Sequence, residues 1–238
     1  SYGVLEVKGA SAFRPFSFTA SGTNGQPLAV TLSLVDGETS VSNAVFNLSI
    51  GNAVAGFTNG AMITINDAAP ASPYPSTINV SGLGGVVSKV SVTVSNFNHQ
   101  WPSDVSMLLV SPAGSKTYLM SRAGGSYWAT NATLTFEDAA SAVLPFSARI
   151  TNGVVKPTSY SQLPPSFPVP VPYATNLSVF NGENPNGTWS LYVLDGMQLY
   201  SGAISNGWSL RVDTSMSVAA DLGVSVTANE ESAIVKSN

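Results

Sequence analysis

The sequence contains no cysteine and only one histidine, His99, in 238 residues. Without thiols, neither a disulfide framework nor a thiolate zinc site can form. The chain also lacks a Gly-x-Ser-x-Gly nucleophile elbow, so nucleophilic catalysis would have to use His99 alone. We therefore expect no catalytic triad, and we interpret His99 as a residue of local packing and hydrogen bonding.

Charged side chains are also scarce, at 9% of the residues, and the formal net charge is only −4. The nine Lys and Arg residues are not clustered, whereas nucleic-acid binding depends on many phosphate contacts, so no nucleic-acid partner is expected. The longest compact apolar run covers residues 107–110, far short of the roughly 20 residues that cross a bilayer, so we expect no membrane span. The chain begins at Ser1 without a signal-peptide pattern, as a processed or excised chain would, and we expect an extracellular or cell-surface location.

Hydrophobic residues, by contrast, are plentiful at 44%, and they alternate with polar residues in many short segments. This period of two is typical of half-buried strands, while no window keeps a helical period for long. The sequence predicts an all-β, jelly-roll-like antiparallel sandwich in which the alternating side chains face one shared interior. The clearest segments are 28–34, 90–94, 134–136, 189–193 and 208–212.

The chain divides into three predicted parts. Residues 1–57 form a small β-rich segment with strand-like pieces at 4–8, 28–35 and 45–50, and residues 58–213 form the sandwich. Five prolines between 164 and 172 exclude a central strand and predict an extended surface loop. Residues 214–238 contain a strand pattern at 220–226, which we interpret as the first strand of a following element.

Five short motifs stand in order within the predicted sandwich: PYPSTINVSGLGG at 73–85, WPSDVSMLLVSPAG at 101–114, LTFEDAA at 134–140, LSVFNGENPNGTWSLYV at 177–193 and GWSLRV at 207–212. Together they resemble a P domain of the bacterial secreted type, over about three fifths of the chain. P domains are β-sandwich modules that follow the subtilisin-like catalytic domain of proprotein convertases, and they also occur without a protease. The resemblance implies a non-catalytic module.

Four carboxylates in or beside these motifs are candidate calcium ligands: Asp104, Glu137, Asp138 and Asp195. Calcium takes six to eight oxygen ligands, which loops between strands can supply, and similar carboxylates bind calcium in some bacterial relatives. The chain departs from the family pattern at Ser103 and Glu137, where relatives carry Asp. The alternative is that these acids cap turns or pair with Arg122, Arg149 or Arg211.

The tryptophans fall into two predicted classes. Trp189 and Trp208 are in phase with the apolar positions of strands, which favours core packing. Trp101, Tyr127 and Trp128 do not fit that phase, and we predict that they form an exposed recognition surface.

We therefore expect a non-catalytic binding or structural module of a larger secreted or surface protein, and the resemblance implies that calcium stabilises it. Its partner would be another protein or a neighbouring domain of the same chain. Two alternatives remain open. One is a fibre subunit that associates with itself through edge strands, and the other is an accessory stabilising domain of a subtilisin-like serine protease, which the resemblance implies.

Overall fold

The computed structural model describes residues 27–36, 38–49, 54–160 and 167–215. The chain splits into two compact units, one made of Ser1–Ile50 with Ser217–Asn238 and the other of Gly51–Met216. In the first unit the described residues form an antiparallel hairpin of β1 (Pro27–Asp36) and β2 (Thr39–Ser49). The strand pieces expected at 4–8 and 220–226 lie outside the described residues.

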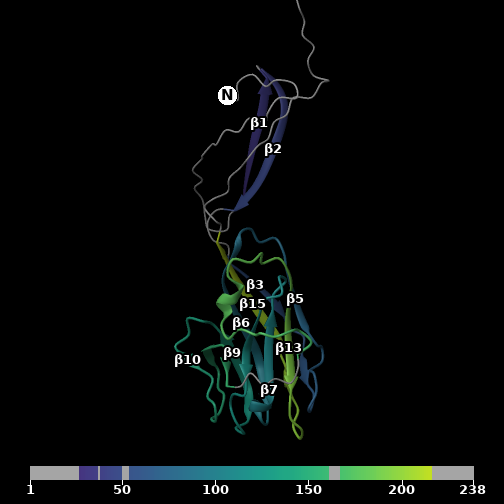
Figure 1. Ribbon diagram of the computed structural model, residues 1–238, viewed down its shortest axis with the longest axis vertical. Helices are drawn as coiled ribbons and strands as arrows, with labels where there is room; N and C mark the ends of the chain where they lie inside the picture. The colour runs from purple at the N-terminus through teal and green to yellow at the C-terminus, as the bar shows by residue number, and fades with distance from the viewer. Residues whose placement is uncertain (1–26, 37, 50–53, 161–166, 216–238) are drawn as a thin grey trace, which may run out of the picture. The chain divides into compact units, whose positions relative to one another are not determined.

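The second unit is a β-sandwich, as the alternating pattern predicts (Figure 1). Its described residues contain two short 3-10 turns, η1 (Pro102–Asp104) and η2 (Leu177–Phe180), and no α-helix. The larger sheet consists of β3 (Val54–Asn59), β4 (Ile63–Ile65), β6 (Val86–His99), β9 (Ala129–Phe136), β10 (Ala142–Val143), β11 (Gly153–Lys156), β14 (Gly202–Ile204) and β15 (Trp208–Ser215). The smaller sheet consists of β5 (Ser76–Val80), β7 (Val105–Val110), β8 (Lys116–Ser121), β12 (Thr158–Ser159) and β13 (Gly187–Asp195).

Side chains from both sheets fill one hydrophobic core, which explains the period of two in the sequence. Trp189 and Trp208 are both buried, which confirms their predicted core position. Each indole nitrogen donates a hydrogen bond inside the core, Trp189 to the carbonyl of Pro185 (2.9 Å) and Trp208 to the hydroxyl of Ser76 (3.0 Å). The polar edge of each ring therefore has a partner, as a buried Trp requires.

Two features of the topology differ from the sequence-based expectation. β3 crosses the expected boundary at residue 58, because all of it pairs with β15 in the larger sheet. The sandwich is also not purely antiparallel: β9–β11, β10–β11 and β8–β12 are parallel pairs at the sheet margins. Short marginal strands can be reached by long connections, and these leave no local pattern in the sequence.

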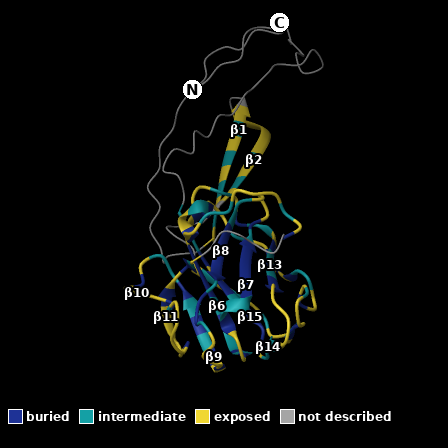
Figure 2. Ribbon diagram, turned by 60° about the horizontal axis from the view of Figure 1, so that its bottom comes forward, coloured by how far each residue is buried: buried dark blue, intermediate teal, exposed yellow. Residues whose placement is uncertain are grey.

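The proline-containing loop does more than run along the surface. Its Phe167 is buried and packs with Leu108, Tyr118 and Leu194 on the outer face of the smaller sheet. Strands β7 and β8 are consequently buried on both faces, as their dark blue colour in Figure 2 shows. Burial on both faces explains why residues 107–110 are continuously apolar rather than alternating.

A bulge in β6 prepares one end of the sandwich for the site described next. Asn96 adopts a left-handed conformation (φ 65°), and the pairing register of β6 shifts at this point. Residues 86–94 pair with β15, whereas residues 97–99 pair with β14. The bulge thus turns the last residues of β6, including His99, onto a different partner strand.

Candidate functional site

Three loops meet at the end of the sandwich where β6, β8 and β13 finish, and we call them the aromatic end: residues 99–104, 122–128 and 195–202. The amide of Ser103 donates to the carbonyl of Gly125 (3.3 Å), and the amide of Gly196 donates to the carbonyl of Asp104 (3.0 Å). Gly124 (φ 88°) lies so close to Pro102 that a Cβ would come within 2.9 Å of that ring. The three loops therefore support one another through backbone contacts.

The aromatic end exposes several large apolar side chains. The exposed fractions are 39% for Trp101, 51% for Tyr127 and 59% for Trp128, the three residues predicted to form a recognition surface. Trp101 stacks on Tyr200, with ring centroids 5.8 Å apart and planes at 12°. Leu199, next to Tyr200, is 81% exposed. Large apolar side chains gathered in neighbouring loops are typical of a contact surface rather than of scattered surface residues.

Leu199 also has a strained backbone, with φ at 101°. A bulky residue in this region is an outlier that costs about 1–3 kcal/mol and persists only where the surrounding structure imposes it. Neither the exposure of Leu199 nor the stacking of Tyr200 was predicted, because nothing in the local sequence indicates which loop side chains remain in solvent.

Beneath the exposed side chains lies a buried pair, His99 and Asp195, whose side chains have no exposed surface. Nε2 of His99 is 3.0 Å from Oδ2 of Asp195, and Nδ1 accepts a hydrogen bond from the amide of Trp101 (3.2 Å). Because Nδ1 is an acceptor, the proton lies on Nε2 and is donated to the carboxylate. The other oxygen of Asp195 accepts from the amide of Met197 (2.8 Å). This arrangement confirms the interpretation of His99 as a packing and hydrogen-bonding residue.

Burial dominates the electrostatics of this pair. Loss of solvent raises the pKa of Asp195, against the lowering effects of the Met197 amide and of His99. The pKa of Asp104 is also raised, first by its own burial and then by the negative charge of Asp195 nearby. Both carboxyl groups therefore have a raised pKa, and burial is the largest cause for each.

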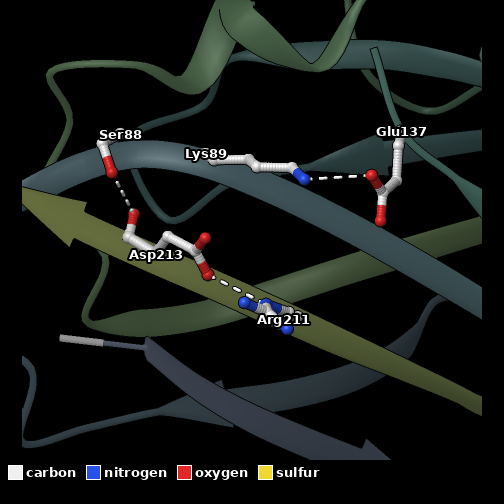
Figure 3. A network of polar contacts seen from close by, with 5 residues as sticks. All are labelled: Ser88, Lys89, Glu137, Arg211 and Asp213. Carbon is white, nitrogen blue, oxygen red and sulfur yellow. Dashed lines mark hydrogen bonds and ion pairs between the residues drawn. The ribbon is translucent and has the colours of Figure 1, made fainter. Parts of the chain in front are cut away.

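The four candidate calcium ligands do not form one set. Asp104 and Asp195 lie at the aromatic end, whereas Glu137 and Asp138 belong to the loop after β9. Figure 3 shows that Glu137 is bound to Lys89, with Nζ 2.9 Å from Oε2. Asp138 accepts hydrogen bonds from the amides of Leu177 and Ser178 (both 2.8 Å) with its two oxygens, at the start of η2.

These contacts decide how well the residues fit calcium. No group of three or more His, Cys, Asp or Glu residues is placed to hold a metal ion within the described part of the chain. Both carboxylate oxygens of Asp138 and of Asp195 accept hydrogen bonds from N–H donors, so these two residues act in the structure as caps and hydrogen-bond acceptors, as the alternative predicted. Calcium binding by the four carboxylates stays a prediction.

The predicted arginine partners are only partly involved. Arg211 pairs with Asp213, with Nε 3.0 Å from Oδ1, rather than with any of the four candidates (Figure 3). Arg149 donates from Nε to the carbonyl of Trp128 (3.2 Å) and so holds the backbone of an exposed aromatic residue. The positive charge of Arg122 acts on Asp104, where it lowers the pKa against the effect of burial.

Comparison with known proteins gives few matches. No family model and no curated protein matches the chain. It is similar to the crystal structure of the Aeromonas sobria serine protease in complex with the chaperone, with a TM-score of 0.35 and 19% identity over 81% of this chain and 28% of that chain. The serine protease of Aeromonas sobria alone gives a TM-score of 0.31 and 19% identity over 79% of this chain and 27% of that chain.

The chain thus spans little more than a quarter of the length of these two structures. At such TM-scores and identities, we derive neither a family nor a function from the likeness. None of the helices in the described residues has the length and hydropathy needed to cross a bilayer.

Proposed function

We propose that residues 51–216 form a non-catalytic module of P-domain type, which binds or supports a partner within a larger secreted or surface protein. The observation that carries this proposal is the state of the only histidine: both ring nitrogens bind protein atoms, and the side chain has no exposed surface. A general base needs a nitrogen within reach of a substrate proton. The same loops leave aromatic and aliphatic side chains in solvent, which favours contact over turnover.

The partner that fits these exposed side chains is a protein surface, either a separate protein or a neighbouring domain of the same chain. Trp101 and Trp128 supply the large, rigid aromatic groups that anchor the centres of protein interfaces, and Leu199 adds exposed apolar surface. An accessory domain that stabilises a subtilisin-like protease, as the resemblance implies, is one context in which such a surface would be used.

The test joins this chain to the domain that adjoins it in the parent protein and measures the melting temperature of that domain. We expect the attached chain to raise it, and we expect Leu199→Ser with Trp101→Ser to remove the rise. Val154→Ser is the matched control, because Val154 is 52% exposed but lies on β11, away from the three loops. If the melting temperature of the neighbouring domain is the same with and without the attached chain, the supporting role is wrong. Saturable turnover of any substrate that depends on His99 would contradict the non-catalytic role.

A fibre subunit is a second candidate, supported by the β1–β2 hairpin. Within the described residues each of its strands pairs only with the other, and a strand edge without a partner can accept a further strand. A two-stranded hairpin of this kind is marginally stable alone, so an added strand would stabilise it. Light scattering at micromolar concentration distinguishes the two roles: polymers that disappear on deletion of residues 1–10 or 217–238 support the fibre, and a monomer rejects it.

A further inference from the structure

An open depression of about 300 Å³ lies at the aromatic end, lined by residues 98–100, 128–130 and 201–202. Trp128 lines it, and none of the residues that line it is acidic, Lys or Arg. This volume is at the small end of the range found for ligand sites. The depression therefore suits one small ring rather than an extended drug-sized molecule, and an aromatic wall suits a ligand with one apolar face.

The polar side chains of the depression are uncharged and partly free. Within the described residues, the amide of Gln100, the hydroxyl of Ser201 and the indole N–H of Trp128 have no hydrogen-bond partner, and Gln100, Trp128 and Ser201 are all exposed. Together they offer both donors and acceptors within one small site. Such a set matches a ligand that carries several hydroxyl groups, because each hydroxyl both donates and accepts.

The walls of the depression are held in place before any ligand arrives. Asn98 accepts from the amide of Asn131 (2.8 Å) and donates to the carbonyl of Asn96 (2.8 Å), which joins β6 to β9. Arg149 holds the Trp128 carbonyl, and its Nη2 is 3.4 Å from the hydroxyl of Thr130. Binding to a site that is already ordered loses less conformational entropy, so even a small ligand can be retained.

A saccharide ring combines the two properties that the depression requires. One face of a pyranose presents C–H groups, which pack against an indole ring, and its edge presents hydroxyl groups, which meet amide and hydroxyl side chains. A phosphate or nucleotide would need cations along the wall, whereas the guanidinium of Arg149 is already bound to Trp128 and Thr130. A purely apolar ligand would leave Gln100 and Ser201 without partners.

We propose that this depression binds one neutral sugar ring of a glycan, with Trp128 as the stacking residue and with Gln100 and Ser201 as hydrogen-bonding residues. The affinity for a single ring is millimolar, since the site is open and small, and a glycan presented in many copies would bind more tightly by avidity. The proposal rests on the proposed function in one respect: the module binds the ring and releases it unchanged.

The test titrates the full chain, labelled with ¹⁵N, with glucose, galactose, N-acetylglucosamine and their disaccharides up to about 50 mM, a range set by the millimolar expectation. We expect the indole N–H resonance of Trp128 to shift in a saturable way with at least one neutral sugar. Trp128→Ala and Gln100→Ala should each weaken that sugar at least about tenfold, while Trp128→Phe keeps part of the affinity. Val154→Ala is the control, because Val154 is exposed on β11 and does not line the depression.

Several results would overturn the proposal. These are the absence of any saturable shift at Trp128, unchanged binding in Trp128→Ala with its native melting curve, or binding only to acidic sugars with a steep dependence on salt. Product formation during the titration would instead overturn the non-catalytic role and leave the binding site standing. If Leu199→Ser no longer stabilises the neighbouring domain but still binds the sugar, the protein-contact surface and the sugar site are separate.

Discussion

Replacement of Asp195 by Asn tests the buried pair with almost no change of shape. The Asn oxygen keeps the hydrogen bond from the Met197 amide, but an NH₂ group now faces Nε2 of His99, where Oδ2 stood 3.0 Å away. Since Nδ1 of His99 accepts a hydrogen bond from the Trp101 amide, Nε2 carries the ring proton. The Nε2–H of His99 and the NH₂ of the Asn side chain are then two donors that face each other. A change of tautomer only moves the conflict to Nδ1, which would then face the Trp101 amide with a proton of its own.

The magnitude follows from one buried donor left without a partner, which costs about 1–3 kcal/mol. Removal of the charge offsets part of this, because burial raises the pKa of Asp195 and so disfavours its ionised form. We expect a net loss of about 1–2 kcal/mol. In a unit of this size each kcal/mol lowers the melting temperature by about 2–4 °C, so Asp195→Asn should melt about 2–8 °C below the unchanged chain.

The difference in stability between the Asp195→Asn chain and the unchanged chain should also depend on pH, in a direction set by the pKa of Asp195. The folded-state pKa of Asp195 is raised, so this group stabilises the fold below its unfolded pKa of about 3.9 and loses that contribution as the pH rises through the folded pKa. Asn does not titrate. The difference in melting temperature between the two chains is therefore largest near pH 4 and becomes smaller as the pH rises above that value.

Calorimetry of both chains between pH 4 and 8 measures the effect, and Glu137→Gln serves as the control. Glu137 is partly exposed and binds the exposed Lys89, and surface pairs of this kind contribute little to stability. Equal melting temperatures for the Asp195→Asn and unchanged chains across this range would refute the reasoning. So would ¹⁵N chemical shifts that place the His99 proton on Nδ1 in the unchanged chain.

Four further predictions concern other residues. Chelation should change the melting temperature by less than about 1 °C, because the predicted calcium ligands lie apart and already accept hydrogen bonds or ion pairs. A higher melting temperature on addition of calcium would instead support a calcium site. Gly202→Ala should strongly destabilise the fold, since its Cβ would lie 2.1 Å from the Asn98 carbonyl, whereas Gly56→Ala meets nothing within 4 Å; equal melting of the two would contradict the close approach of β14 to β6. Asp138→Ala should lose about 1 kcal/mol with its cap on η2, measured by urea unfolding; an unchanged midpoint would show that the cap has no effect. Leu199→Gly should raise the melting temperature by relief of its positive φ while it weakens partner support, and a lower melting temperature would show that the side chain stabilises the loop.

The strands could be predicted from the sequence because their signal is local. Val92 of β6, Leu191 of β13 and Leu210 of β15 occupy alternate positions, and each is buried in the shared core. A chain segment with this period has one apolar face wherever it lies, so the pattern survives without knowledge of its neighbours. The exposed position of Trp101, Tyr127 and Trp128 agrees with the same reasoning, since they are out of phase with a strand.

The contacts across loops could not be predicted, because their signal is not local. His99 and Asp195 are 96 residues apart, and nothing beside either residue indicates the other. The sequence placed Asp195 among the calcium ligands because a carboxylate after a strand is equally suited to a metal, a histidine or a backbone amide. The parallel pairing of β9 with β11 depends in the same way on the path of the intervening chain.

At the aromatic end, both polar and apolar side chains lie where such side chains are usually not found. A histidine and a carboxylate are buried beneath it, while Leu199 and Trp128 stand in solvent above it. Both placements are energetically unfavourable, since a buried ionisable pair loses its hydration and an exposed apolar group orders water. A sandwich could be closed at this end by small polar turns, as most hairpins are, without either loss. Stability alone therefore does not account for these loops. The buried pair instead positions the exposed residues: Nδ1 of His99 accepts a hydrogen bond from the amide of Trp101, and Trp101 stacks on Tyr200, the neighbour of Leu199.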